Sequence, residues 1–189
     1  THPELAPEFN ELADLFRRKL WHQMTTKLET FFPRISAKYP PPDQLALRLY
    51  SKFVKEFDTK LNQLSLAKFA AVAAFHCTSI TDQLNIFGEI ADRCSKPGLQ
   101  PTPTIIGAQA MAVSCSGLAY AMAGQQIEAR GCMERAEGLI ETGGPGTGPL
   151  DGVVYLYYHR LRMRCHTARG TSEDSEFYTS SIACLSLMN

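Results

Sequence analysis

Apolar side chains recur every three or four residues along most of the chain, without the strict alternation of a half-buried β-strand. Each such stripe lies on one face of a helix and has to be buried against a neighbour. The stripes run over residues 5–16, 20–31, 43–61, 66–75, 80–94, 103–123, 129–139, 154–165 and 177–185. Because helices joined by short loops stack as antiparallel pairs, we predict an all-α fold of about nine helices. The expected architecture is a right-handed, tetratricopeptide-like α-solenoid.

Two stretches rich in proline or glycine divide the chain. Pro33 and the prolines at 40–42 lack an amide donor and clash with a preceding helical turn, so residues 33–42 are expected to form a loop. The tract 143–149, in which glycine alternates with proline, predicts a flexible connector. We therefore expect one helical-repeat domain over residues 1–189, with a first helix pair in 1–32, central pairs in 43–142 and a last pair in 150–189.

Capping residues set several expected helix starts. Ser65 is expected to cap the fourth helix, and either Ser79 or Thr81 the fifth, because a hydroxyl oxygen can accept from a free amide of the first turn. Thr102 followed by Pro103 is typical of an N-cap and the first helical position, where the missing amide of proline has no cost.

The sixth and seventh stripes carry small residues at the spacing of a tetratricopeptide helix–turn–helix. The positions are Gly117, Tyr120, Gly124, Ala129, Met133 and Ala136. Gly117 and Ala129 would let two helix axes approach closely, and Gly124 would supply a left-handed turn. Tyr120 would fill the space beside them. The motif predicts a helix pair and no ligand, and the other repeats are degenerate.

The composition indicates a protein without long-range charge steering. Nineteen basic residues balance nineteen acidic ones, so a general attraction to nucleic acid or to an anionic membrane is not expected. The longest apolar run, Leu66–Phe75, is shorter than the roughly 20 residues of a membrane span. The amino terminus lacks the pattern of a signal peptide. The six cysteines form no CxxC pair and are expected to be buried free thiols of a cytosolic or nuclear protein.

No set of residues predicts catalysis, a cofactor or a metal site. The sequence contains no GxSxG, no phosphate-binding glycine loop and no HExxH motif. His76 precedes Cys77 and Cys165 precedes His166, but neighbours on a helix point about 100° apart and do not converge on one ion. We therefore expect buried thiols and surface imidazoles, including His159.

Two features are candidates for contact with a partner. Trp21, the single tryptophan, lies beside Leu20 on an amphipathic stripe, where packing in the core is favoured over a role as a partner anchor. Arg160 and Arg164 share one face of the eighth predicted helix. Because the whole chain is neutral, we favour a solvated face or a protein partner with acidic residues over a nucleic-acid groove.

Three segments carry a family resemblance. They are 12–24, with Lys19-Leu20-Trp21-His22-Gln23 at its centre, 47–66, with Tyr50, Phe53 and Phe57, and a weaker one at 177–185. They resemble the amino-terminal helical repeats of the 26S proteasome non-ATPase regulatory subunit 13 family, PCI-family subunits of the proteasome lid. The carboxy-terminal PCI module of that family is expected to be absent from this chain, and the tract after Thr142 to be an insertion.

The resemblance implies a non-catalytic structural subunit of the regulatory particle, without cofactors, in the cytoplasm and nucleus. Its implied partners are a neighbouring PCI subunit, the deubiquitinase pair of the lid and the ubiquitin-receptor subunit. From the residues alone, two other functions stay open. A free tetratricopeptide-like adaptor that binds a peptide would need several regular repeats with Asn or Lys clamps, and one clear repeat is present. A helical enzyme or metal protein would need convergent ligands.

Overall fold

The computed structural model describes residues 3–18, 20, 23–24, 26–27, 30–31, 34, 38, 63–75, 79–143 and 150–168. Within these residues the protein is helical and has no β-strand, which confirms the all-α prediction for this part of the chain. The elements are η1 (Pro3–Leu5), α1 (Ala6–Arg17), α4 (Gln63–Phe75), α5 (Ile80–Cys94), α6 (Pro103–Met122), α7 (Gln126–Gly143) and α8 (Gly152–Ala168). Six of the nine predicted helices are thus seen. The stripe at 20–31 is described only in part, and the stripes at 43–61 and 177–185 lie outside the described residues.

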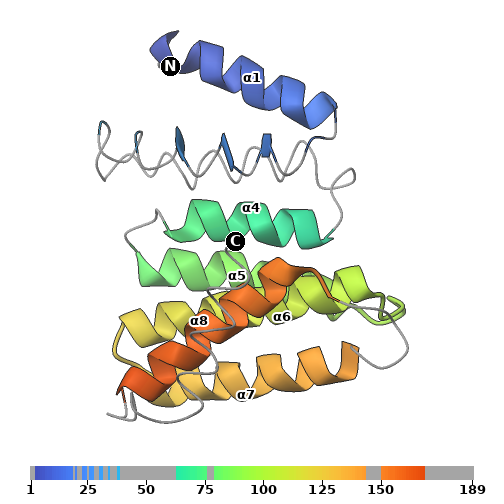
Figure 1. Cartoon of the computed structure of the whole chain (residues 1–189), viewed down its shortest axis with the longest axis vertical. Coiled ribbons are helices and arrows are strands. Elements are labelled where there is room, and N and C mark those ends of the chain that lie inside the picture. The colour runs from blue at the N-terminus through green and yellow to red at the C-terminus, as the bar shows by residue number, and fades with distance from the viewer. Residues whose placement is uncertain are drawn as a thin grey trace.

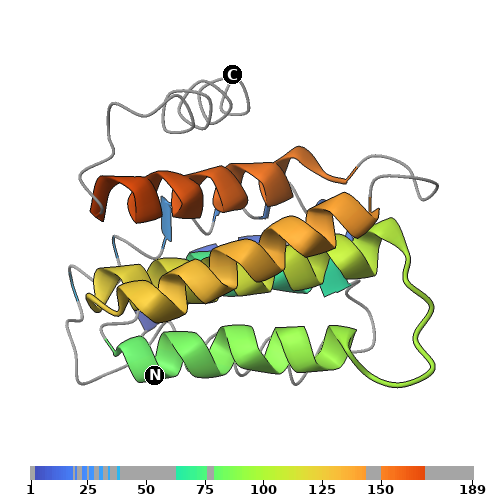
Figure 2. The ribbon, with the colours of Figure 1, turned by 90° about the horizontal axis from the view of Figure 1, so that it is seen from below.

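The helices follow one another along the long axis of the molecule. Figure 1 shows α1 at one end, α4 and α5 next, and α6, α7 and α8 towards the other end. Seen from below, α5 and α8 lie on opposite sides of α6 and α7 (Figure 2). The central position belongs to α6, which contacts α4, α5, α7 and α8.

Small apolar residues explain why α6 occupies the centre. Its alanines at 108, 110, 112 and 119 and Cys115 are fully or almost fully buried, because neighbouring helices cover it on several sides. By length and composition α6 is also apolar enough to cross a membrane, but 67% of its most apolar 18-residue window is buried inside the protein. A helix that is apolar all round is expected in such an interior position.

The caps of α5 and α6 follow the local sequence. The Ser79 hydroxyl accepts from the amide of Asp82, so Ser79 caps α5 and Thr81 lies in its first turn. The Thr102 hydroxyl accepts from the amide of Ile105, directly before Pro103, which confirms the predicted start of α6. The predicted cap at Ser65 is wrong, because α4 already begins at Gln63.

The first two elements, η1 and α1, pair with the described residues between 24 and 38 in an antiparallel register. Three ion pairs join the two sides: Lys27 with Glu11 at 2.7 Å, Arg34 with Glu8 at 2.6 Å and Lys38 with Glu4 at 3.8 Å. Between them the ring of Phe31 is buried and meets Phe9 edge to face, with 5.6 Å between the ring centroids. These contacts hold together the N-terminal hairpin, defined here as residues 3–38.

The loop predicted over residues 33–42 is wrong at Arg34 and Lys38, which are both helical. These two side chains are four residues apart and pair with Glu8 and Glu4, which have the same spacing. Pairing with another element can outweigh an unfavourable local propensity such as that of proline, which is why the local pattern misplaced this boundary.

The start of the predicted Gly/Pro connector is also wrong by one residue. Gly143 is the last residue of α7 and is buried, and a Cβ added to it would lie 2.8 Å from Cγ2 of Ile106. Close packing of α7 on α6 therefore keeps this glycine helical. Residues 144–149 lie outside the described part, and the chain continues at the buried Leu150.

A long-range ion pair marks the start of α8. Asp151 accepts from the amide of Val153 at 3.0 Å and from Nζ of Lys68 in α4 at 2.7 Å. Burial alone would raise the pKa of Asp151, but the hydrogen bonds from Lys68 and Val153 and the charge of Lys68 outweigh it and lower that pKa. The pair joins residues 83 apart in sequence.

Candidate protein-interaction surface

The helices α6, α7 and α8 make their closest approach at Gly117. A Cβ placed there would lie 2.5 Å from Cδ2 of Leu161 in α8 and 2.9 Å from Cβ of Cys132 in α7. Real Cβ atoms almost never come so close to other heavy atoms, so only glycine fits without a shift of its neighbours. Gly117 therefore sets how closely α6 packs against both following helices.

The other small residues of the helix-pair motif form the turn between α6 and α7 and the contact of α7 with its neighbours. Gly124 has a φ of 77°, in the left-handed region, directly after α6 ends. Ala129 is fully buried against Leu118 and Leu161. Ala136 is fully buried beside Tyr158, while Tyr120 is half-buried against the cluster around Ala129.

A hydrogen bond between side chains ties α8 to α7 along this contact. The Tyr158 hydroxyl donates to a carboxylate oxygen of Glu137 at 2.7 Å. Burial, followed by the hydrogen bond to Glu137 and its negative charge, raises the pKa of Tyr158. The Tyr158 hydroxyl therefore stays protonated throughout the physiological pH range and can donate this hydrogen bond at every pH in it.

The basic face predicted on the eighth helix is exposed. Arg160 and Arg164 both lie at the surface of α8, and neither forms an ion pair with another described residue. The guanidinium of Arg160 lies over the ring of Tyr157, 5.5 Å from its centroid, a cation–π contact. Arg162, on another side of the helix, is half-buried, and burial together with its charge lowers the pKa of His159.

The thiols and imidazoles do not assemble into a metal site in the described part of the chain, where no group of three or more His, Cys, Asp or Glu side chains converges. Burial raises the pKa of Cys94 to about 11 and raises those of Cys115 and Cys132. The expectation of a surface imidazole is wrong for His166, which is buried two turns after the buried Tyr158. Cys77, Cys184, His22 and His76 lie outside the described residues.

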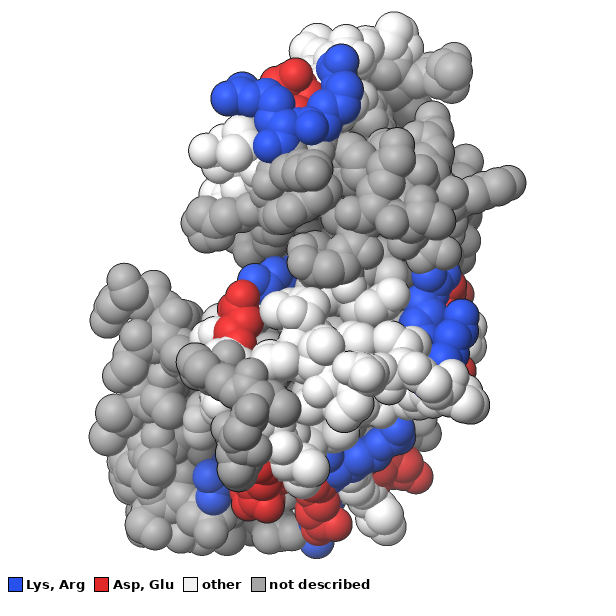
Figure 3. Space-filling view, turned by 90° about the vertical axis from the view of Figure 1, so that its right-hand side faces the viewer, with Lys and Arg blue, Asp and Glu red and all other residues white. Residues whose placement is uncertain are grey.

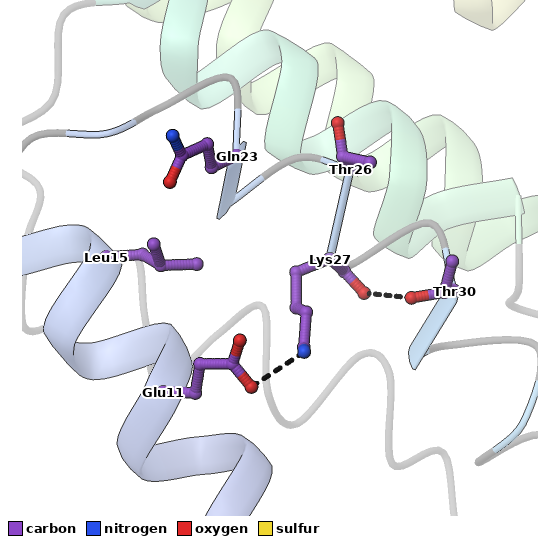
Figure 4. A pocket seen from close by; sticks show the side chains of 6 residues that line it. All are labelled: Glu11, Leu15, Gln23, Thr26, Lys27 and Thr30. Carbon is purple, nitrogen blue, oxygen red and sulfur yellow. Dashed lines mark hydrogen bonds and ion pairs between the residues drawn. The ribbon is translucent and has the colours of Figure 1, made fainter.

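A small open hollow lies between the two sides of the N-terminal hairpin. It encloses about 420 Å³ and is lined by Glu11, Leu15, Gln23, Thr26, Lys27 and Thr30 (Figure 4). The ion pair between Lys27 and Glu11 crosses it, and the Thr30 hydroxyl donates to the carbonyl of Lys27 at 2.9 Å. Because its two charged groups neutralise each other, the hollow has no net charge with which to bind an ionic ligand.

Charged side chains on the face shown in Figure 3 gather in small mixed groups of both signs around an uncharged middle. The described residues of this face provide no continuous basic track along which a nucleic-acid backbone could bind. They are compatible with contacts to other proteins, which combine apolar area with scattered charges.

Several sequence-predicted residues of interest lie outside the described part. They are Trp21, Tyr50, Phe53 and Phe57. Leu20, the neighbour of Trp21, is half-buried and packs against the cluster of buried apolar residues that includes Leu12, Leu15 and Phe31. The core-packing role expected for Trp21 therefore stays a prediction.

Two exposed apolar side chains beside the α6–α7 turn were not predicted. Met122 is 52% exposed and Ile127 is 85% exposed. The signal for Ile127 was present in the sequence, because it precedes the apolar stripe of 129–139 and does not share its spacing.

The described part of the fold is that of an all-α protein made of packed helices, with a small-residue crossing of α6, α7 and α8 at Gly117. The chain belongs to the family of PSD13 N-terminal repeats, whose model matches residues 8–189. It is 29% identical, over 98% of its length, to the 26S proteasome non-ATPase regulatory subunit 13 homolog A of Arabidopsis thaliana, and covers 45% of that protein.

Two further relatives are also proteasome regulatory subunits by name. The 26S proteasome non-ATPase regulatory subunit 13 of Dictyostelium discoideum is 27% identical over 97% of this chain, which covers 44% of that protein. The 26S proteasome regulatory subunit RPN9 of Saccharomyces cerevisiae is 42% identical over 35% of this chain and 16% of its own length. The chain thus spans less than half the length of these relatives.

Proposed function

We propose that this chain forms the helical-repeat part of a non-catalytic structural subunit in the lid of the 26S proteasome regulatory particle, acting in ubiquitin-dependent protein degradation. The observation that carries the proposal is the family match over residues 8–189, joined by relatives whose names place them among the regulatory, non-ATPase subunits. A structural role would be geometric, since the chain would hold other subunits in position.

The packing of α6 supports a stacked, solenoid-like arrangement of one domain. In a solenoid each helix pair contacts the pair before and the pair after it. Here α6 pairs with α7 and also contacts α4 and α5 on one side of the sequence and α8 on the other. We propose that the remaining predicted pairs continue this stack, with Trp21, Tyr50, Phe53 and Phe57 in its core.

The proposed partners are those that the family resemblance implies: a neighbouring PCI subunit, the deubiquitinase pair and the ubiquitin-receptor subunit. The proposed location is the cytoplasm and nucleus, where the particle acts. Arg160 and Arg164 are exposed and form no ion pair with any described residue, which suits an acidic protein partner. Opposite charges on two partners speed their encounter and fix their register.

The test is affinity purification of the full protein, tagged in its own cells, with quantitative mass spectrometry of the proteins that accompany it. We expect the other lid subunits in amounts close to that of the tagged protein, and their absence from a parallel purification of the tag alone. A free peptide-binding adaptor would instead bring down one partner without the lid. Purification without regulatory-particle subunits would overturn the proposal.

A further inference from the structure

The α6–α7 turn exposes two large apolar side chains to water. Met122 ends α6 and Ile127 is the second residue of α7, with the left-handed Gly124 between them. They are 52% and 85% exposed, and Leu99, the other large apolar residue with comparable exposure in the described part, lies before the opposite end of α6. Single exposed apolar residues are ordinary, whereas two on either side of one tight turn are a candidate for contact with a partner.

A partly desolvated cation lies one helical turn from Ile127. Arg130 is half-buried, its Nε atom is shielded from water, and this atom has no hydrogen-bond acceptor. Arg130 lies seven residues before Glu137, on the face of α7 from which Glu137 reaches Tyr158 in α8. By this spacing Arg130 lies on the side of α7 that meets α8, three residues after the exposed Ile127.

No acidic side chain on α7 forms an ion pair with Arg130. Glu134 lies four residues after Arg130, at a spacing that commonly gives an ion pair, yet Arg130 forms no ion pair with any described residue. A buried donor without an acceptor is costly, and a partly desolvated charge interacts more strongly with a carboxylate than a fully hydrated one. Among the described residues, Arg130 therefore lacks a negatively charged group as its partner.

We propose that Met122, Ile127 and Arg130 form a docking surface, the turn-end surface, for a segment of a neighbouring regulatory-particle subunit. This segment presents a large apolar side chain and a carboxylate about one helical turn apart. Ile127 and Arg130 are three residues apart on α7, so an amphipathic helix with an apolar residue and an acid at a spacing of three or four would match both. The inference rests on the proposed function and adds the chemistry of one contact.

The test uses the full, tagged protein with a photo-crosslinking amino acid in place of Ile127, purified with its companions and irradiated. Mass spectrometry then identifies the crosslinked peptide. We expect a segment of another regulatory-particle subunit that carries Asp or Glu within about one turn of the crosslinked residue. A matched protein with the crosslinker in place of Leu99, at the other end of α6, should not label that segment.

Charge exchange then tests the role of Arg130. Arg130→Glu should lower the crosslinking yield about tenfold, the size expected for loss of a close charge pair. Replacing the identified partner acid with arginine should restore it. Lys96→Glu changes the net charge equally at the opposite end and should leave the yield unchanged. Ile127→Ser, at a position that is 85% exposed, provides a second variant that leaves the core unchanged and should weaken retention of the same subunit in a salt wash.

Each other result overturns the inference. Copurification of the lid without a crosslink from position 127 would show that the turn-end surface is not a docking site, and it would leave the proposed function intact. A crosslink to a second copy of this chain would show self-association at this surface. A crosslinked segment without an acid, or an unchanged yield in Arg130→Glu, would contradict the proposed contact between Arg130 and a carboxylate of the partner. Absence of regulatory-particle subunits from the unsubstituted protein would overturn the proposed function as well.

Discussion

The N-terminal hairpin and the bundle of α4 to α8 bury their apolar residues in different ways. In the hairpin, α1 packs one stripe, with Leu12 and Leu15 inside, while its acidic residues pair with Lys27 and Arg34 across the contact. In the bundle, α6 is covered on several sides and packs through glycine and alanine. The hairpin is held by large side chains and its flanking charges, and the bundle by close approach of its helices.

This difference determines which substitutions each region tolerates. A contact made by large side chains weakens when atoms are removed, because a cavity remains. A contact made by small residues weakens when atoms are added, because the neighbouring helices have to move apart. The two regions should therefore respond in opposite ways to a change in side-chain volume.

The largest effect is expected in the hairpin, for Phe31→Ala. The Phe31 ring is 2% exposed and packs on Phe9, so its removal should lower the free energy of unfolding by about 3–5 kcal/mol. Chemical denaturation followed by circular dichroism measures this. Gln23→Ala, at an exposed position of the same region, should change it by less than about 0.5 kcal/mol. Equal effects of the two variants would contradict the packing described for the hairpin.

A smaller effect is expected in the bundle for Gly117→Ala. Alanine favours a helix, but its Cβ would meet Leu161 and Cys132, and the net loss should be about 1–3 kcal/mol. The matched control is Gly131→Ala, where a Cβ meets nothing within 4 Å, and there alanine should stabilise by about 0.5–1 kcal/mol. Thermal denaturation of both variants should thus shift in opposite directions.

The same crossing can be tested through its partner. Leu161→Ala removes two of the three atoms closest to the added Cβ, so Gly117→Ala should cost less in that background than in the unsubstituted protein. Purely additive effects in this double-mutant cycle would show that the two side chains do not compete for the same space.

A weaker effect is expected for Asp151→Asn, which removes the charge paired with Lys68. Asparagine caps a helix as well as aspartate does, so the change isolates the ion pair and should cost about 0.2–1 kcal/mol at pH 7. The pKa of Asp151 is lowered in the folded protein, so its contribution is complete above the unfolded pKa of about 3.9 and is lost as the pH falls through the lower folded value.

Urea denaturation between pH 2 and pH 7 measures this dependence. The stabilities of the two proteins should converge at the acidic end, where Asp151 is protonated in both states. A difference that stays constant over the whole range would contradict the role of the charge.

The smallest effect is expected for the ion pair between the exposed Arg34 and the half-buried Glu8. A double-mutant cycle with Arg34→Gln and Glu8→Gln should give a coupling of about 0–1 kcal/mol, because solvent screens the exposed guanidinium. The coupling should fall further in 1 M salt, where the screening length is about 3 Å. A coupling that persists in high salt would mean that the pair is less solvated than its exposure indicates.

Local signals were enough to predict much of the bundle. The predicted bounds of α5 agree with the structure because the capping Ser79 precedes it and the break at 96–101 follows it. The left-handed turn at Gly124 was predictable because glycine adopts this conformation without strain. Spacing alone also pointed to the small-residue crossing at Gly117.

The errors arose where distant contacts decide the structure. Arg34 and Lys38 are helical beyond a proline because they pair with α1. Gly143 stays helical because it packs on Ile106, and Lys68 meets Asp151 across 83 residues without a local signal. The spacing of Ile127 indicated its exposure, but the turn-end surface was missed because the burial of the Arg130 Nε atom appears only in the packed structure.

Hydrogen exchange of backbone amides, followed by mass spectrometry, compares the rigidity of the two regions directly. If α6 is the helix on which the other helices of the bundle pack, amides of residues 103–122 should exchange most slowly, at a rate set by global unfolding. Amides of α1, at the end of the molecule, should exchange faster. Exchange in α6 that is as fast as in α1 would contradict a structural core centred on α6.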